Sequence, residues 1–129
     1  MEREGQREQF EERLLEYAAE CIRIAESLPS SYTGKHLTGQ LVRCGTAPYA
    51  HHGEAQSAES VDDFIHKMSI ALKELRESSR WLKLIARVPL LADLSTLNSV
   101  LAESDQLQRI FHSSIRTAKQ RSPRRNPRP

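Results

Sequence analysis

Two adjacent histidines and a nearby glutamate are the residues whose types and spacing could do chemistry most directly in this sequence. They lie in the segment GTAPYAHHGEAQ, residues 45–56, as His51, His52 and Glu54. Imidazole and carboxylate groups one turn apart on a helix can bind a metal ion or transfer protons. A di-iron helical bundle, however, needs a Glu-x-x-His pair on two helices and a glutamate on each of the other two. The pair here is single and reversed, and the remaining histidines supply no matching motif: His36, His66 and His112.

We therefore favour a hydrogen-bonded polar cluster at the end of a helical bundle over exposed side chains, and a bound functional metal least of all. A metal-dependent enzyme that uses the region around His51 is a remote alternative. The sequence has no Gly-x-Ser-x-Gly motif and no glycine loop of the phosphate-binding type. Asp62 and Asp63 are typical of a helix start, and Glu74 and Glu77 of a solvated face. We predict a protein that is not an enzyme, with no catalytic residues, no metal and no cofactor.

The strongest functional signal is the uneven distribution of charge along the chain. All 17 acidic residues lie at or before Asp105, and residues 1–105 carry 12 basic residues, which gives a net charge of −5. From Gln106 onward the chain has no acid and a net charge of +7. Such a polycation can neutralise phosphates in a sequence-independent and salt-sensitive manner. The candidate nucleic-acid-binding residues are Arg109, Arg116, Lys119, Arg121, Arg124, Arg125 and Arg128, with Arg43, Lys35 and Arg80 as an extension.

Two other interpretations of this basic end remain open. The charge can complement the dipole of the last helix and aid solubility. Alternatively, the acidic first helix of a neighbouring subunit can be its partner.

The composition is that of one helical domain. With 129 residues the chain is long enough to bury a core, and its few aromatic residues leave that core to Leu, Ile, Val and Ala. Cys21 and Cys44 are too few for a disulfide framework, and we interpret each as a small buried apolar residue. No apolar run is long enough to span a membrane, and the charged N-terminal segment does not resemble a secretory signal. We expect a cytoplasmic protein that does not bind membranes.

Apolar residues recur at spacings of three and four in four segments, each of which is predicted to be a helix. The first extends from Phe10 to Leu28 and is ended by Pro29. The second covers about residues 35–54, with a bend at Pro48 and a close approach to a neighbouring helix at Gly45.

The third helix begins with Ser60 as its cap, followed by acidic residues that suit a helix start, and Pro89 closes it. Asp93 or Ser95 can cap the fourth, whose apolar face ends at Ala118. Four helices, short connections and no strand pattern predict an all-α fold, an antiparallel up-down-up-down four-helix bundle. We assign residues 1–121 to the bundle and residues 122–129 to a basic, disordered C-terminal tail.

Some apolar residues lie beside the main seams of the last two helices. A single bundle does not bury so wide a surface, and we expect the surplus to form a subunit interface. The alternative is a set of scattered exposed apolar side chains. The residues concerned are Ile65, Trp81, Leu84, Val100, Leu107 and Ile110.

The segment from Leu37 to Ile85 contains several specific motifs. They are Leu-Thr-x-Gln-Leu-x-Arg from Leu37, Gly-Thr-x-Pro from Gly45, Gly-Glu-Ala-Gln from Gly53, and Asp-Phe-Ile-x-Lys-x-x-x-Ala-Leu-Lys-Glu from Asp63. With them, residues 10–119 resemble the four-helix bundle proteins encoded within intervening sequences of bacterial large-subunit ribosomal RNA genes.

This resemblance implies an antiparallel four-helix bundle similar to the accessory protein of diversity-generating retroelements, whose relatives form pentameric rings and bind nucleic acid through basic surfaces. In similar sequences the positions of His51 and His52 are usually Asn and Tyr, which argues against a family-wide metal site. We expect a non-enzymatic homo-oligomer, with a pentamer favoured, that acts as a nucleic-acid-associated accessory or scaffold protein. RNA, DNA and a nucleic-acid enzyme such as a reverse transcriptase are the expected partners. The alternative is a protein-binding oligomeric adaptor without nucleic-acid contact.

Overall fold

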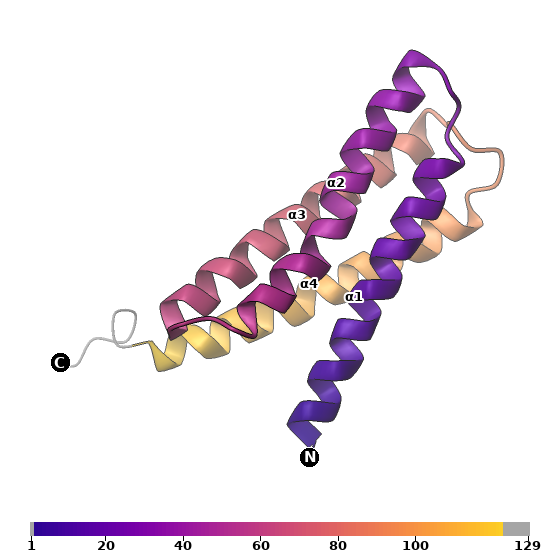
Figure 1. Cartoon of the computed structure of the whole chain (residues 1–129). Helices are drawn as coiled ribbons and strands as arrows, with labels where there is room; N and C mark the ends of the chain where they lie inside the picture. Colours follow the sequence, from indigo (N-terminus) through magenta and orange to yellow (C-terminus); the bar gives the residue numbers. More distant parts are fainter. Residues whose placement is uncertain (1, 123–129) are drawn as a thin grey trace.

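Four long α-helices make up the described part of the chain (Figure 1). The computed structural model describes residues 2–122, with side chains from residue 5 onward. The helices are α1 (Glu2–Glu26), α2 (Tyr32–Ala55), α3 (Val61–Arg87) and α4 (Ser95–Arg121). No strand is present among these residues, so the all-α prediction is confirmed. The predicted disordered tail, apart from Ser122, lies outside the described residues.

The helix starts follow the local chemistry of the chain. The Ser60 hydroxyl accepts a hydrogen bond from the Asp63 amide at 3.0 Å, which confirms the predicted cap of α3. The Ser31 hydroxyl does the same for Gly34 at the start of α2, at 3.1 Å, and α2 therefore begins three residues earlier than predicted. At α4 the N-cap is Leu94, not Asp93 or Ser95 as predicted, although the Asp93 carboxylate accepts a hydrogen bond from the Ser95 amide at 2.9 Å.

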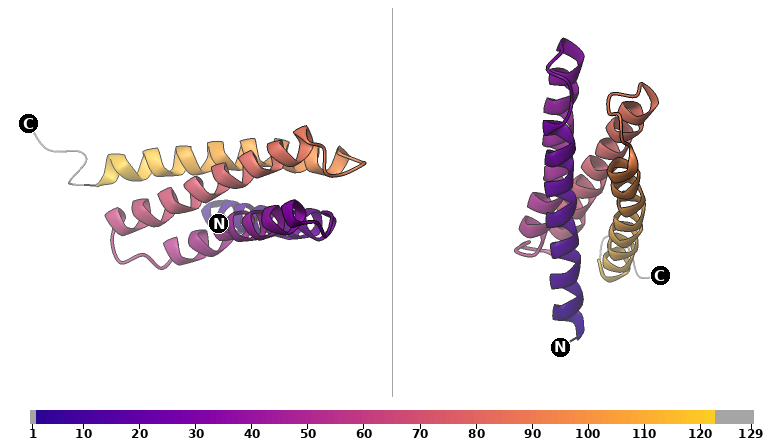
Figure 2. Two further views of the ribbon diagram at one scale, coloured as in Figure 1. Left: turned by 90° about the horizontal axis from the view of Figure 1, so that it is seen from above. Right: turned by 90° about the vertical axis from the view of Figure 1, so that its right-hand side faces the viewer.

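Each helix packs against the next one along the chain, and α1 also contacts α4 over a shorter stretch. Figure 2 shows α1 and α2 lying together, with α3 and α4 beside them as a second pair. The first turns of α1 stand away from the other helices in both figures. Surface depressions flank α4 on both sides, one towards the middle of α1 and one towards α3.

The core runs the length of the bundle and takes aliphatic side chains from all four helices. Among its fully enclosed members are Leu14, Leu41, Leu75, Leu82 and Leu107. Phe10 and Phe111 add an aromatic pair to this core, with ring centroids 5.1 Å apart in an edge-to-face arrangement.

The surplus of apolar surface predicted on the last two helices is largely absent. Ile65, Val100 and Leu107 are buried inside the bundle, at 3%, 5% and 0% exposure, so they are not available for a subunit contact. The prediction was wrong because α3 and α4 each pack against two neighbours, which buries a wider stripe than one seam. Trp81 and Ile110 are half-buried against the core, and only Leu84, at 45%, is exposed.

Helices α1 and α2 approach one another closely at Gly45. A Cβ atom on Gly45 would lie 2.7 Å from the Cys21 Cβ and 2.8 Å from its Sγ, so the close contact predicted at this glycine is confirmed. Both cysteines are free and buried, as expected, and burial raises the pKa of the Cys21 thiol and of the Cys44 thiol to about 12. The helix continues through Pro48, where the chain lacks one amide donor.

None of the helices in the described part of the chain is both long enough and apolar enough to span a membrane.

Candidate nucleic-acid interface

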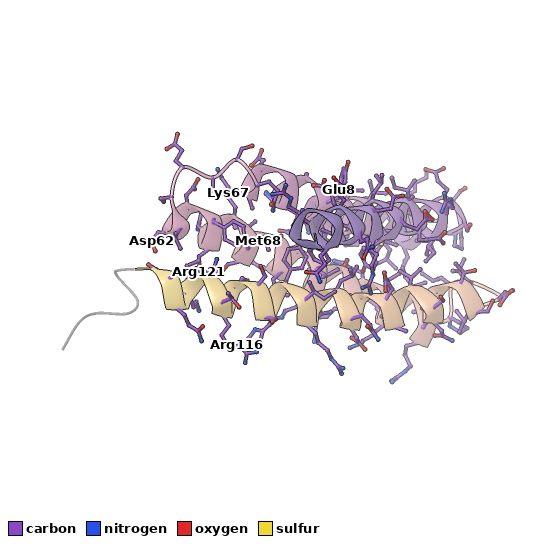
Figure 3. All side chains as sticks on the ribbon, turned by 90° about the horizontal axis from the view of Figure 1, so that it is seen from below. Glu8, Asp62, Lys67, Met68, Arg116 and Arg121 are labelled. Atoms are coloured by element: carbon purple, nitrogen blue, oxygen red, sulfur yellow. The ribbon has the colours of Figure 1, made fainter. Side chains whose placement is uncertain are left out.

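The outer face of α4 presents two of the predicted cations. Arg109 and Arg116 are seven residues apart, a spacing that puts both on one side of a helix, and both are exposed. In Figure 3 Arg116 points away from the other helices, into solvent. Their guanidinium groups are therefore free to meet a polyanion.

A depression of about 610 Å³ separates this face of α4 from α3. Arg109 and Arg116 line it from α4, together with His112, and Arg76 lines it from α3. Asp105 is the one acidic residue among its described lining residues. The depression thus brings three arginines from two helices around one hollow.

Arg76 belongs to a stripe of cations on α3 that the charge count had not singled out. Arg76, Arg80, Lys83 and Arg87 follow one another at spacings of four, three and four, which places them on one face of the helix, and all four are exposed. Of these, only Arg80 was considered as an extension of the site. The spacing of these cations is visible in the sequence. The net charge of the segment does not reveal it, because acids of the same helix, such as Glu74 and Glu77, offset the positive charges.

The end of α4 is fixed to the start of α3. The Ser122 hydroxyl is buried and donates a hydrogen bond to the Asp62 carboxylate at 2.7 Å. Ser122 therefore packs with the bundle, although the predicted boundary assigned it to the tail. Lys119 and Arg121 occupy the last turn and are exposed, whereas Arg124, Arg125 and Arg128 lie outside the described residues.

The exposed cations on the adjoining faces of α3 and α4 form no ion pair with the rest of the described chain. Within residues 5–122, neither Arg76, Arg109 nor Arg116 forms an ion pair, and the same holds for the other exposed cations of this face: Arg80, Lys83, Arg87 and Lys119. We call these seven residues the α3–α4 basic face.

On the other side of α4 the charges compensate one another. Arg13 of α1 donates to both carboxylate oxygens of Glu103 on α4, at 2.9 and 2.7 Å. Arg23 donates to Glu16 and Glu20 of its own helix, at 3.0 and 2.5 Å. The depression between α1 and α4, about 800 Å³, is lined by three of these glutamates and so offers no net positive charge.

Arg43 does not join the other predicted site residues. It lies between α2 and α3, where it forms ion pairs with Glu74, at 3.0 Å, and with Glu77. The hydrogen bond to Glu77 raises the pKa of Arg43 further above its ordinary value, and the carboxylate in turn has a lowered pKa, chiefly through a hydrogen bond from Trp81. These acids, interpreted above as a solvated face, hold Arg43 in place.

His52 is a structural residue of the core. It is 3% exposed, and its ring packs edge-on against Phe10, with centroids 5.0 Å apart. Its Nδ1 lies 3.3 Å from the Glu11 carboxylate and its Nε2 lies 3.2 Å from the amide of Gln56. Burial lowers its pKa, an effect that the hydrogen bond to Glu11 opposes. The favoured interpretation of His52 as a hydrogen-bonded polar residue is thereby confirmed.

The two adjacent histidines do not act together. His51 is only half-buried, on the neighbouring side of α2, whereas His52 faces the core. Within the described part of the chain, no three His, Cys, Asp or Glu side chains are grouped so that they could hold a metal ion.

Fold and surface together define a protein that is all-helical in its described part and carries a cluster of unpaired cations on α3 and α4. Its sequence matches the model of the 23S rRNA-intervening sequence protein over residues 9–113, and the chain therefore belongs to that family. A crystal structure from Bacteroides thetaiotaomicron, of a protein with unknown function from the S23 ribosomal protein family, is similar to this chain. The two share 29% identity with a TM-score of 0.76, over 82% of this chain and 97% of that one. No curated protein matches the sequence.

Proposed function

We propose that this protein is a non-enzymatic, cytoplasmic accessory or scaffold protein that binds nucleic acid through its α3–α4 basic face. The observation that carries the proposal is the clustering of seven unpaired cations on one face. Arg13, Arg23 and Arg43 each have a carboxylate partner, whereas the cations of the α3–α4 basic face have none. Unpaired cations gathered on one surface favour an external polyanion.

The arrangement suits contact with a phosphate backbone. Along α4, Arg109 and Arg116 are about 10 Å apart, and along α3 the stripe from Arg76 to Arg87 spans about 16 Å, from the rise per residue of a helix. In an antiparallel up-down-up-down bundle these two rows run side by side, and the depression between them can receive one strand. Nucleic-acid binding by such rows of cations should depend on the charge and shape of the backbone more than on base sequence.

The family name supports RNA as the polyanion. It associates these proteins with intervening sequences of 23S rRNA, and the resemblance to retroelement accessory proteins adds a nucleic-acid enzyme, such as a reverse transcriptase, as a further partner. DNA and RNA both carry the phosphates that the basic face fits.

We also propose self-association, with a pentamer favoured on the same resemblance. The support on the surface comes from exposed apolar residues that sequence reasoning did not single out. Leu15 and Ile22 lie seven residues apart on α1, at 42% and 40% exposure, and therefore share one face. Leu84 of α3 remains from the predicted set. A ring uses a heterologous contact, so the α1 face would meet a different surface of the neighbouring copy.

The alternative function is an oligomeric adaptor that binds proteins and does not contact nucleic acid. The observation in its favour is the acidic character of α1, with Glu8, Glu11, Glu12, Glu16 and Glu20 on one helix, which could receive a basic surface.

The test is binding of a fluorescein-labelled single-stranded RNA and a labelled DNA duplex, measured by fluorescence anisotropy at low salt. We expect saturable binding of both, with little preference for sequence. Light scattering on the same sample, at micromolar concentration, should give a mass several times that of one chain. A multimer that binds neither nucleic acid would establish the adaptor, and a monomer would remove the proposed self-association.

A further inference from the structure

A second basic hollow lies at the end of the bundle where α2 meets α3 and α4 ends. It is a depression of about 700 Å³, and all four helices contribute to it. Arg7 lines it from α1, Gln56 follows the end of α2, Phe64 belongs to the first turn of α3, and Arg121 closes it from the last turn of α4. Figure 3 shows Arg121 on the side of α4 that faces the other helices, opposite Arg116.

The charge of this depression is uniformly positive. Its lining includes two arginines, and among the described residues that line it none is acidic. Neither Arg7 nor Arg121 forms an ion pair within residues 5–122. This lining contrasts with that of the depression between α1 and α4, which includes three glutamates.

Three acids near the lining residues have partners outside the depression. Asp62 accepts the hydrogen bond from Ser122, and Asp63 forms an ion pair with Lys67 at 3.0 Å. Glu11, one turn after Arg7, lies against His52 at 3.3 Å. Arg7 and Arg121 are the two charged side chains among the described residues that line the depression.

The remaining lining offers an aromatic and apolar wall beside polar groups. Phe64 is half-buried against the core and lines the depression together with Val61 and Ala118. Thr117 and Gln56 add a hydroxyl and an amide, which can donate or accept hydrogen bonds. Cations next to an aromatic residue are the combination by which proteins hold single-stranded nucleic acid, with phosphates on the cations and a base stacked on the ring.

We propose that this depression binds one unpaired nucleotide of a single-stranded nucleic acid, with Arg7 and Arg121 on its phosphate and Phe64 against its base. Its volume lies within the range of about 300 to 1,000 Å³ that is usual for small-molecule sites. The inference deepens the proposed function and rests on it, because it takes nucleic acid as the ligand. It adds a distinct site, which prefers an unpaired nucleotide over a duplex.

The test is an NMR titration of the full-length protein with uridine 5′-monophosphate, with inorganic phosphate as a second probe. In the native protein we expect saturable shifts of the amides around residues 61–64 and 117–121. Arg7→Gln with Arg121→Gln should weaken uridine monophosphate binding about tenfold or more, because the loss of both charges leaves the phosphate unpaired. The matched control is Arg109→Gln with Arg116→Gln, which removes the same charge from the outer face of α4 and should leave these shifts unchanged.

A third variant tests the base contact. Phe64→Leu keeps an apolar side chain against the core and should weaken uridine monophosphate about fivefold or more, without weakening inorganic phosphate. Thermal melting of each variant establishes that it is folded. The inference is overturned if the native protein shows no saturable shifts, or if uridine monophosphate binds no better than phosphate. If the native protein binds a DNA duplex but not uridine monophosphate, this inference fails and the proposed function of the α3–α4 basic face stands. If it binds uridine monophosphate but not a duplex, the proposed function of the α3–α4 basic face fails and this inference stands.

Discussion

The first and second helix pairs of this protein carry opposite charge. Residues 1–60, with α1 and α2, have 6 basic and 10 acidic side chains, a net charge of −4, whereas residues 61–122, with α3 and α4, have 10 basic and 7 acidic side chains, a net charge of +3. The difference in unpaired charge is larger, because Arg13 and Arg43 of the first helix pair form ion pairs with acids of the second pair. Those acids are Glu74, Glu77 and Glu103.

This comparison separates two uses of charge. Ion pairs between helices link the two helix pairs at the surface, and the geometry of Arg13 with both oxygens of Glu103 is the best defined of them. Seven cations without an ion pair lie together on the α3–α4 basic face. The clustering of unpaired cations therefore identifies the candidate interface better than net charge does.

The largest effect is expected when the basic face is neutralised. Arg76, Arg109 and Arg116 replaced together by Gln should lower nucleic-acid affinity by about 100-fold or more at roughly 0.1 M salt, because three phosphate contacts and their counterion release are lost. The matched control removes the same charge from paired positions, with Arg23 and Arg43 replaced by Gln together with Lys67→Gln. That control should lose no more than about threefold. Anisotropy titrations compare the two, and equal losses would show that only net charge matters.

The next effect concerns the packing of the first helix pair. Gly45→Ala places a Cβ within 2.7 Å of Cys21, and we expect it to lower the free energy of unfolding by about 1 to 3 kcal/mol through overpacking. Gly39→Ala is the control in the same helix, where nothing lies within 4 Å, and it should raise stability by up to about 1 kcal/mol through helix propensity. Denaturant unfolding of both variants measures the two values. The same sign for both would contradict the close contact.

A smaller effect is expected at the chain end. Truncation after Ser122 should leave the free energy of unfolding unchanged. Truncation after Ala118 should lower it by about 1 kcal/mol, because the hydrogen bond from Ser122 to Asp62 is lost. Melting followed by circular dichroism distinguishes the two lengths. If the shorter chain melts at the same temperature as the longer one, Ser122 does not anchor α4.

The pH dependence of stability should reflect the buried imidazole of the core. Because burial lowers the pKa of His52 in the folded protein below its ordinary value of 6.5, the unfolded chain takes up this proton more readily. The stability is therefore fully present above about pH 6.5 and is lost as the pH falls towards the lowered value. Unfolding measured from pH 7 down to about pH 5 should show this decline in the native protein and a flatter profile in His52→Gln. A decline of the same size in His52→Gln would assign it to other groups.

The sequence predicted the elements of the fold well, because they depend on local patterns. The spacing of apolar residues gave four helices, Ser60 gave the start of α3, and Gly45 gave a close contact through its missing side chain. What failed depended on neighbours. Ile65 and Val100 were predicted to be exposed apolar residues, because the apolar pattern of one helix does not show how many other helices pack against that helix.

The candidate site could be predicted only in part for the same reason. Arg109 and Arg116 followed from the absence of acids after Asp105, a property of the sequence alone. Arg43 looked equivalent to them, and only the packing of α2 on α3 places it against two glutamates. Arg76 was missed because the helix that carries it also carries the acids that pair with Arg43.

The most direct test of the central claim is the salt dependence of nucleic-acid binding by the native protein. If about six phosphates are neutralised, the affinity for duplex DNA should fall with a log–log slope of roughly −5 and slightly less steeply for a single strand. Each arginine of the α3–α4 basic face replaced by Gln should reduce that slope by about one. A slope near zero, or no binding at low salt, would contradict the account and favour the protein-binding adaptor.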